Sequence, residues 1–223
     1  MVFIDIQHRE VTLKLVYYGP ALSGKTTNLQ QLHAQLGPHT GTSLMTLNTR
    51  DDRTLFFDLL PLQLSTAQGL AIKLKLFTVP GQVYHAATRR IVLQGADGVV
   101  FVADSRISET RNNNESFADL RHNLAENAIA IEDIAVVIQF NKRDLAGIRS
   151  DDEVERIAAK GAEPIYKAIA IDGVGVVETF RGLAASTWAK LERRFEMERR
   201  FGVQPGELLE QLDALLAKAG SPP

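Results

Sequence analysis

The stretch Gly19-Pro20-Ala21-Leu22-Ser23-Gly24-Lys25-Thr26 has the spacing of a phosphate-binding P-loop. Its glycines permit backbone angles and close approaches that a Cβ would block. In such a loop the backbone N–H groups converge on phosphates, Lys25 reaches the β- and γ-phosphates, and the Thr26 hydroxyl can bind Mg²⁺. We therefore predict a nucleotide-binding loop made of Gly19, Ala21, Leu22, Ser23, Gly24, Lys25, Thr26 and Thr27.

The sequence on either side of this loop fits the motif. Residues 11–18 are rich in β-branched, aromatic and aliphatic side chains, as in a buried strand. After the loop, leucines recur at spacings of three and four, which indicates a helix that ends near Gly37-Pro38. The amino end of that helix would point at the phosphates, where its dipole and free N–H groups favour an anion.

Composition excludes several classes of protein. The chain has 223 residues, of which 45% are hydrophobic and 23% charged, as in an ordinary globular α/β domain. The formal net charge of -2 predicts no general affinity for nucleic acid. The absence of cysteine rules out disulfide scaffolds and fits a cytoplasmic protein. No apolar run is long enough to span a membrane, and the first residues do not resemble a secretory signal.

Strands and helices are expected to alternate along the chain. We predict a surface loop at 37–54, a strand at 55–60 that lies at a sheet edge or ends at Pro61, and further strands at 72–76, 99–103, 134–138 and 165–170. Helices are expected near 117–128 and 176–191. This order predicts a three-layer P-loop α/β fold with a mostly parallel six-stranded sheet and helices on both faces. Ligands of such folds bind at the carboxyl ends of the strands.

Asn141-Lys142-Arg143-Asp144 follows one of these predicted strands and has the N-K-x-D spacing of a guanine-reading motif. The Asp144 carboxylate can accept hydrogen bonds from N1–H and from the exocyclic amine of guanine. Adenine offers no such pair of donors, so the carboxylate would discriminate against it. Asn141 and the stem of Lys142 would hold the loop and cover the base. Asp104-Ser105, at the end of another strand, is interpreted as a turn.

The combination of motifs resembles the Ras-like small GTPases, and within them the bacterial MglA subfamily of gliding-motility and cell-polarity proteins. The residues that carry this resemblance are Tyr17-Tyr18-Gly19-Pro20, residues 52–58, Thr78-Val79-Pro80-Gly81-Gln82 and the N-K-x-D motif. Thr78 stands where most of these GTPases have aspartate, a departure typical of the MglA subfamily. The similarity extends over roughly residues 8–190.

The resemblance implies roles for individual residues. Gly81 would donate its N–H to the γ-phosphate, and Gln82 would orient the attacking water. Arg53 would act in cis as an arginine finger. Thr54 would bind Mg²⁺ together with Thr26. Ala170 would contact guanine through its backbone N–H.

The implied function is that of a GTP-driven switch, with Mg²⁺ as cofactor and GTP or GDP as ligand. The resemblance also implies an MglB-like activating homodimer, an exchange factor and effectors of motility or polarity. Such a protein is cytoplasmic and is recruited to a cell pole or a membrane-associated complex through its partners. Neither a nucleic-acid partner nor an integral membrane segment is expected.

Two residues depart from the common GTPase pattern. Thr78 has no carboxylate to offer to the surroundings of Mg²⁺, and Asp58 on the neighbouring strand is a candidate to replace it. Ala21 stands where glycine is usual, close to the γ-phosphate, so its methyl group would push the catalytic groups out of line. This leaves a GTP-dependent scaffold without turnover as an alternative. A P-loop kinase is a second alternative, which the N-K-x-D motif disfavours.

The tail is expected to form a separate extension. We predict a GTPase domain over residues 1–190 and a helical extension over 191–223. A charged helix at 190–201 would be followed by an amphipathic helix whose leucines recur between 208 and 216. That helix is too short to be stable alone. Three alternatives remain for its apolar face, in decreasing order of preference: it packs on the domain, it contacts an effector or a second copy of the chain, or it binds a lipid surface.

Overall fold

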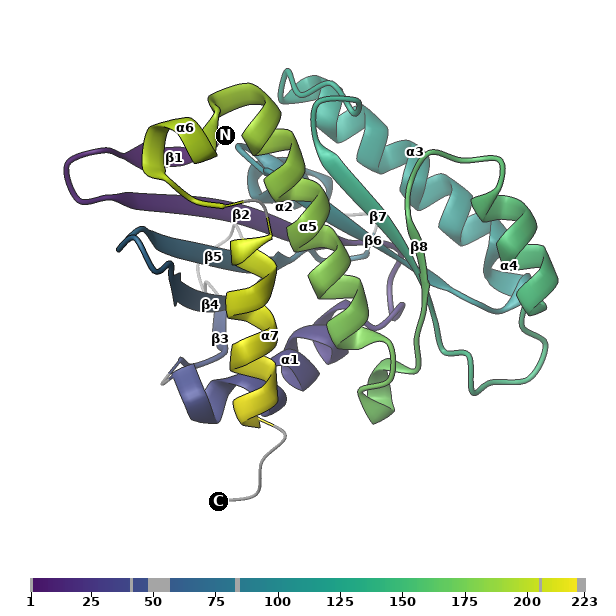
Figure 1. Cartoon of the computed structure of the whole chain (residues 1–223). Helices are drawn as coiled ribbons and strands as arrows, with labels where there is room; N and C mark the ends of the chain where they lie inside the picture. Colours follow the sequence, from purple (N-terminus) through teal and green to yellow (C-terminus); the bar gives the residue numbers. More distant parts are fainter. Residues whose placement is uncertain (1, 41, 48–56, 83–84, 205, 220–223) are drawn as a thin grey trace.

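The computed structural model describes residues 2–40, 42–47, 57–82, 85–204 and 206–219. One twisted sheet forms its centre, with helices on both faces (Figure 1). Its strands are β1 (Phe3–Asp5), β2 (Glu10–Tyr18), β3 (Met45–Leu47), β4 (Phe57–Ser65), β5 (Ala71–Thr78), β6 (Gly98–Asp104), β7 (Ala135–Asn141) and β8 (Ile165–Lys167).

The strand order in the described residues is β3-β4-β5-β2-β6-β7-β8, with β1 paired to the start of β2. The neighbours β5-β2-β6-β7-β8 pair in parallel, whereas β1, β3 and β4 join the sheet antiparallel. The parallel strands β6 and β7 contain the apolar runs at 99–103 and 135–138 because helices cover both of their faces. The expected three-layer, mostly parallel fold is therefore confirmed, with two short strands more than the six predicted.

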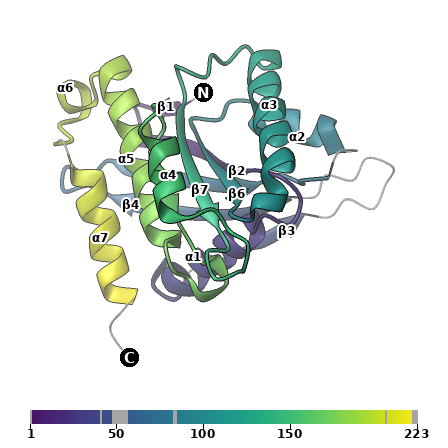
Figure 2. The same ribbon diagram turned by 90° about the vertical axis from the view of Figure 1, so that its right-hand side faces the viewer.

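The helices separate into two layers (Figure 2). Two hydrophobic clusters, one for each layer, fill the space between helices and sheet. The layer on one face consists of α1 (Lys25–Thr40), α5 (Val176–Phe195), α6 (Met197–Phe201) and α7 (Glu207–Ala219). The other consists of α2 (Ala86–Leu93), α3 (Thr110–Glu126) and α4 (Asp151–Ala158).

Several predicted boundaries were wrong. Helix α1 continues past Gly37-Pro38 to Thr40. Within the stretch predicted as a loop, β3 pairs with β4 over three residues. Strand β4 continues through Pro61, where β3 no longer covers it, so the proline lies at a sheet edge as expected. Strand β8 ends at Lys167, and the short helix η3 (Ala170–Asp172) follows.

The charged helix of the tail is broken into α5 and α6 at Glu196, whose φ of 50° is left-handed. Beyond α6, helix α7 packs on α1, α5 and β4, and its Leu208 and Leu212 are fully buried. Arg181 of α5 also holds Asp213 of α7 in a two-point ion pair at 2.7 and 2.8 Å. Packing on the domain is thus what the structure shows, while the division of the chain at residue 190 stays a prediction.

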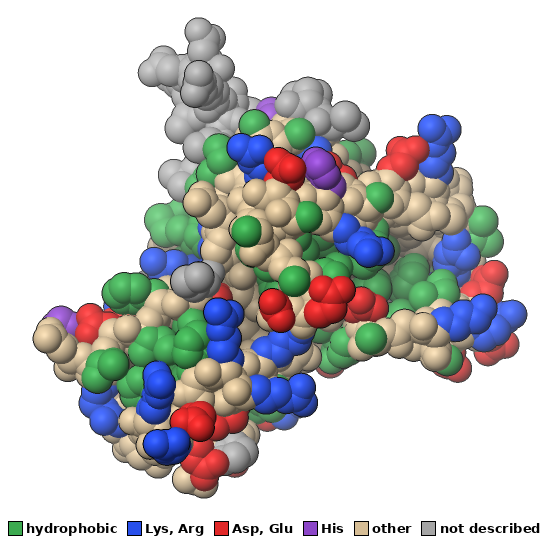
Figure 3. Space-filling model, turned by 90° about the horizontal axis from the view of Figure 1, so that it is seen from above, with side chains coloured by type: hydrophobic (Ala, Val, Ile, Leu, Met, Phe, Trp, Pro, Cys, Tyr) green, Lys and Arg blue, Asp and Glu red, His purple; other side chains and the backbone are tan. Residues whose placement is uncertain are grey.

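None of the helices in the described ranges is both long and apolar enough to cross a membrane. On the face shown in Figure 3, basic and acidic side chains of the described residues are interspersed. This distribution agrees with the small net charge of the chain.

Replacing Leu212 by alanine tests the packing of α7. We expect the free energy of unfolding to fall by about 2–5 kcal/mol, because the substitution leaves a cavity where a fully buried side chain was. Urea denaturation followed by circular dichroism measures it. Glu210→Ala, an exposed position on the same helix, should change stability by less than about 0.5 kcal/mol. Equal losses in the two variants would contradict this packing.

Candidate functional site

The predicted phosphate loop connects the end of β2 to the start of α1 at the carboxyl edge of the sheet. Gly19 and Gly24 have φ angles of 142° and 102°. A Cβ on Gly19 would lie 2.2 Å from the carbonyl oxygen of Val102, and one on Gly24 would lie 2.2 Å from Nδ2 of Asn141. Both glycines are therefore required by close contacts as well as by backbone angle. Between them, Leu22 is also left-handed, and its side chain is 88% exposed.

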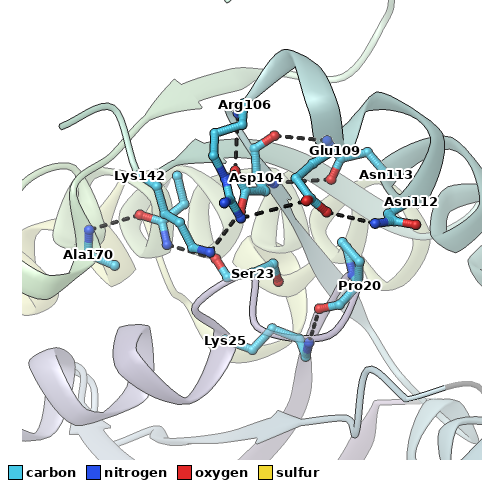
Figure 4. Close-up of polar contacts among 11 residues, drawn as sticks. Pro20, Ser23, Lys25, Asp104, Arg106, Glu109, Asn112, Asn113, Lys142 and Ala170 are labelled. Atoms are coloured by element: carbon cyan, nitrogen blue, oxygen red, sulfur yellow. Dashed lines mark hydrogen bonds and ion pairs between the residues drawn. The ribbon is translucent and has the colours of Figure 1, made fainter. Parts of the chain in front are cut away.

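Lys25, at the start of α1, is 7% exposed. Its Nζ donates to the carbonyl oxygens of Gly19 at 2.9 Å and Pro20 at 2.6 Å, so the side chain curls back over the loop (Figure 4). Burial, with a smaller effect from the charges of Arg89 and Lys142, lowers the pKa of Lys25 to about 7. A buried amine among positive charges is a favourable environment for an anion such as phosphate.

Thr26, the predicted Mg²⁺ ligand, donates from Oγ1 to Oδ2 of Asp58 at 2.7 Å. Thr78 lies beside Asp58 across the β4–β5 pair; its hydroxyl donates to the same carboxylate at 3.0 Å and accepts from the Asp58 N–H at 2.9 Å. Thr46 donates to the other carboxylate oxygen at 2.9 Å. The carboxylate that Thr78 lacks is therefore supplied from the adjacent strand, next to Thr26.

These residues suit a Mg²⁺ ion that is held partly by waters and phosphates, and not a metal ion that is held by protein side chains alone. Within the described ranges no group of three or more His, Cys, Asp or Glu side chains could hold a metal ion. Mg²⁺ commonly keeps several waters and binds through one or two protein oxygens together with substrate phosphates. The Thr26 hydroxyl with Asp58 behind it is a donor set of that kind.

Asn141, at the end of β7, connects three parts of the predicted site. Its Nδ2 donates to the Ser23 carbonyl oxygen in the phosphate loop at 2.8 Å, and its Oδ1 accepts from the Ala170 N–H at 2.8 Å. The side chain is 2% exposed. Asp144 lies three residues later, is exposed, and makes no polar contact within the described part of the chain. Its carboxylate is thus open to a ligand.

Asp104, at the end of β6, was interpreted as part of a turn, and its carboxylate does accept from the N–H two residues further on, but it also holds charged side chains of the site. Its carboxylate accepts two hydrogen bonds from the Arg106 side chain at 3.0 and 2.7 Å, one from the Arg106 N–H at 3.1 Å, and one from Lys142 at 2.7 Å (Figure 4). Burial opposes ionisation, but these hydrogen bonds and charges outweigh it and hold the pKa of Asp104 at about 2. Asn113 of α3 binds the backbone N–H and carbonyl of Asp104, at 3.0 and 2.8 Å.

Asp104 therefore positions Lys142, whose φ of 65° turns the backbone immediately after β7. The sequence did contain a signal for this role: a carboxylate directly after an apolar strand, at the same edge of the sheet as the phosphate loop and the N-K-x-D motif. It was missed because aspartate is also common in turns.

A polar network inside the core supports this edge. Gln139 of β7 exchanges two hydrogen bonds of 2.9 Å with Asn28 of α1, and its Nε2 also donates to Thr179 of α5 at 2.9 Å. All three side chains are fully buried. The Nδ2 of Asn28 also donates to the Gly24 carbonyl oxygen at 2.9 Å. The network fixes α1 and its loop relative to β7 and α5.

The structure brings Ala21, Gly81 and Gln82 together. A Cβ on Gly81 would lie 2.4 Å from the backbone nitrogen of Ala21, so the two loops are in direct contact. With Arg89 and part of α3 they line a cavity of about 740 Å³. Arg53 and Thr54, the other residues predicted for catalysis and Mg²⁺ binding, lie outside the described residues.

Comparison with known proteins gives the family. No family model matches the chain. The chain is 45% identical over 193 residues to the mutual gliding-motility protein MglA of Myxococcus xanthus (strain DK1622), a match that covers 86% of this chain and 99% of that protein. Identity at this level over nearly a whole relative agrees with the fold and with the arrangement of the motifs. The chain belongs to the MglA family of small GTPases.

Proposed function

We propose that the protein binds GTP and GDP and hydrolyses GTP to GDP as a molecular switch. One observation carries the proposal: Asn141 of the guanine-reading motif is hydrogen-bonded to Ser23 of the phosphate loop. This bond holds the base-reading and phosphate-binding segments at a fixed separation, as recognition of a single nucleotide requires. The family membership supports the same conclusion.

The phosphates bind in the loop between Gly19 and Thr27. Loop N–H groups donate to the α- and β-phosphates, and Lys25 leaves the two carbonyls that it now contacts to bind the β- and γ-phosphates. Thr26 and Thr54 hold Mg²⁺, with Asp58 orienting Thr26. When bound there, the ion would supply positive charge next to the phosphate oxygens.

Guanine binds against the loop after β7. Asp144 accepts two hydrogen bonds from the base, and the Lys142 stem, fixed by Asp104, covers the ring. Asn141 holds the loop, and its Oδ1 accepts the N–H of Ala170 at the neighbouring strand end. The Ala170 N–H, which was predicted to contact guanine, is therefore used within the protein in this structure and would have to leave Asn141 to reach the base.

Hydrolysis takes place beside Ala21. Gly81 donates its N–H to the γ-phosphate, Gln82 orients the attacking water, and Arg53 stabilises the charge of the transferring phosphoryl group. Release of the γ-phosphate then frees the segments near 40–60 and 79–90, which is the switching event.

The name of the Myxococcus relative points to a role in gliding motility, and we extend this to regulation of cell polarity or motility by the present chain. The partners are an MglB-like activating homodimer, an exchange factor and effectors. The proposed location is the cytoplasm, with recruitment to a cell pole or membrane-associated complex. Identification of the nucleotide that copurifies with the protein, followed by phosphate release with and without the activating partner, tests the proposal.

A GTP-dependent scaffold with little turnover is the second candidate. The contact between Gly81 and Ala21 favours it, because an alanine there leaves little room for the γ-phosphate and the attacking water. Gln82 favours the switch, because a binding module needs no residue to orient water.

Replacing Asp144 by asparagine tests guanine recognition. We expect affinity for GDP to fall at least about 100-fold, since the amide cannot accept both hydrogen bonds. Affinity for xanthosine diphosphate should rise, because its 2-carbonyl can accept from the new amide. Fluorescent nucleotide titration measures both. Asp152→Asn, an exposed carboxylate on α4, is the control and should leave GDP affinity unchanged. Unaltered GDP affinity in Asp144→Asn would refute the base assignment.

Asp58→Asn tests the carboxylate that replaces the usual aspartate. We expect the Mg²⁺ concentration that half-saturates nucleotide retention to rise about 10–100-fold, because Thr26 loses its charged partner. Nucleotide release is measured over a Mg²⁺ series. The double variant Asp58→Asn/Thr78→Asp restores a carboxylate at the more common position and should recover part of the loss. The same Mg²⁺ dependence in the single variant and the parent would show that Asp58 has no such role.

Ala21→Gly separates the switch from the scaffold. Removing the methyl group should raise the rate of GTP hydrolysis, intrinsic or stimulated, by up to about 10²-fold, because a misplacement of about 1 Å can cost that much. Single-turnover assays on the GTP-loaded protein measure the rate, and GTP affinity serves as the internal control. If the glycine variant hydrolyses GTP no faster than the parent, the methyl group of Ala21 does not limit the rate.

A further inference from the structure

Arg89 of α2 belongs to none of the motifs, yet its side chain is buried and extends toward the phosphate loop. It is 6% exposed, and it lines the same cavity as Ala21 and Gln82. A buried guanidinium is retained only when its charge and its N–H groups have partners. The partners of Arg89 therefore indicate its function.

One partner is the loop that carries the proposed catalytic glutamine. The Nη1 of Arg89 donates to the backbone carbonyl oxygen of Gln82 at 2.6 Å. The same carbonyl also accepts from the His85 N–H at 3.2 Å, in the turn that leads into α2. The guanidinium thus holds the backbone of Gln82 directly.

The second partner anchors the guanidinium to the rigid part of the fold. The Nε of Arg89 donates to Oδ2 of Asp119 on α3 at 2.8 Å. The hydroxyl of Tyr18 donates to the same oxygen, and Asn123 in turn donates to the Tyr18 hydroxyl at 3.2 Å. Tyr18 is the last residue of β2, immediately before Gly19. Arg89 therefore connects Gln82 to the strand end that carries the phosphate loop.

We propose that Arg89, fixed by Asp119 and Tyr18, is the positioning residue that sets the place of Gln82 relative to the γ-phosphate. This inference rests on the proposed function of GTP hydrolysis. Gly81 already touches Ala21, so the loop cannot move closer, and Arg89 prevents it from moving away. Since a displacement of about 1 Å can reduce a rate by about 10²-fold, this hydrogen bond bears on the chemical step rather than on binding.

The experiment compares Arg89→Gln with Arg90→Gln. Arg90 is the next residue of α2, is exposed and pairs with Glu126 at 3.3 Å, so it is a matched control. Single-turnover GTP hydrolysis should slow at least about tenfold in Arg89→Gln, whereas GTP and GDP affinity should change by less than about threefold. Arg90→Gln should hydrolyse GTP at the parental rate.

Two further measurements exclude a merely structural effect. Added guanidinium should partly restore hydrolysis to Arg89→Ala but not to Gln82→Leu. Asp119→Asn should slow hydrolysis less than Arg89→Gln, and the double variant should be no slower than Arg89→Gln alone, because the two residues act as a unit. If Arg89→Gln fails to fold, Tyr18→Phe, which removes a single hydroxyl, should still slow hydrolysis at unchanged nucleotide affinity.

The proposal is overturned if folded, GTP-loaded Arg89→Gln hydrolyses GTP within twofold of the parent. It is also overturned if affinity and rate fall in equal proportion. Failure of the proposed function has a different signature: the parent releases no phosphate, or Gln82→Leu is as fast as the parent. In that case amide hydrogen exchange decides. Gly81 and Gln82 should exchange at least about fivefold faster in Arg89→Gln than in Arg90→Gln, and equal exchange would refute the positioning role.

Discussion

The site depends on one buried side chain, Asn141, more than on any other group. Its amide joins the phosphate loop at Ser23 to the loop after β8 at Ala170, and it lies where a side chain on Gly24 would otherwise stand. A buried amide with both ends satisfied is stabilising, whereas one with an unmade bond is costly. The three strand ends are therefore held in a single arrangement, so the proposed base-binding side is formed before a nucleotide binds.

The charged groups of the site differ in whether they have a partner of opposite charge. Asp104 and Glu109 together balance the charges of Arg106 and Lys142, and the contacts of Asp104 keep its carboxylate ionised despite burial. Lys25 has only backbone carbonyls as partners in its described contacts, and burial among positive groups lowers its pKa. The positive charge left uncompensated is thus concentrated at the phosphate loop. An anion that binds there gains more than it would beside Lys142, which already has its carboxylate.

The sequence predicted the parts of the site that are encoded locally. The phosphate loop requires glycine at two positions, and buried parallel strands require long apolar runs, so both features can be recognised without coordinates. Pairing across strands is not encoded in this way. Asp58 was a candidate because its strand was expected beside the one that ends at Thr78, but only the structure shows the register that brings the two side chains together. Asp104 resembled a residue of an ordinary turn. Arg89 could not be identified, since a single arginine on a short helix usually lies on the surface.

Among the described residues, different contacts hold the two sides of the site, and this difference bears on how a switch could work. The base side is fixed by Asn141, by Asp104 with Asn113, and by the buried network of Gln139, Asn28 and Thr179. On the γ-phosphate side, Arg89 provides the side-chain contact to the Gln82 carbonyl in the described residues. Regions that must move are drawn from the less stable parts of a fold. A protein arranged in this way can keep its nucleotide through the base while the Gln82 segment changes position, because these contacts of the base side do not involve Gln82.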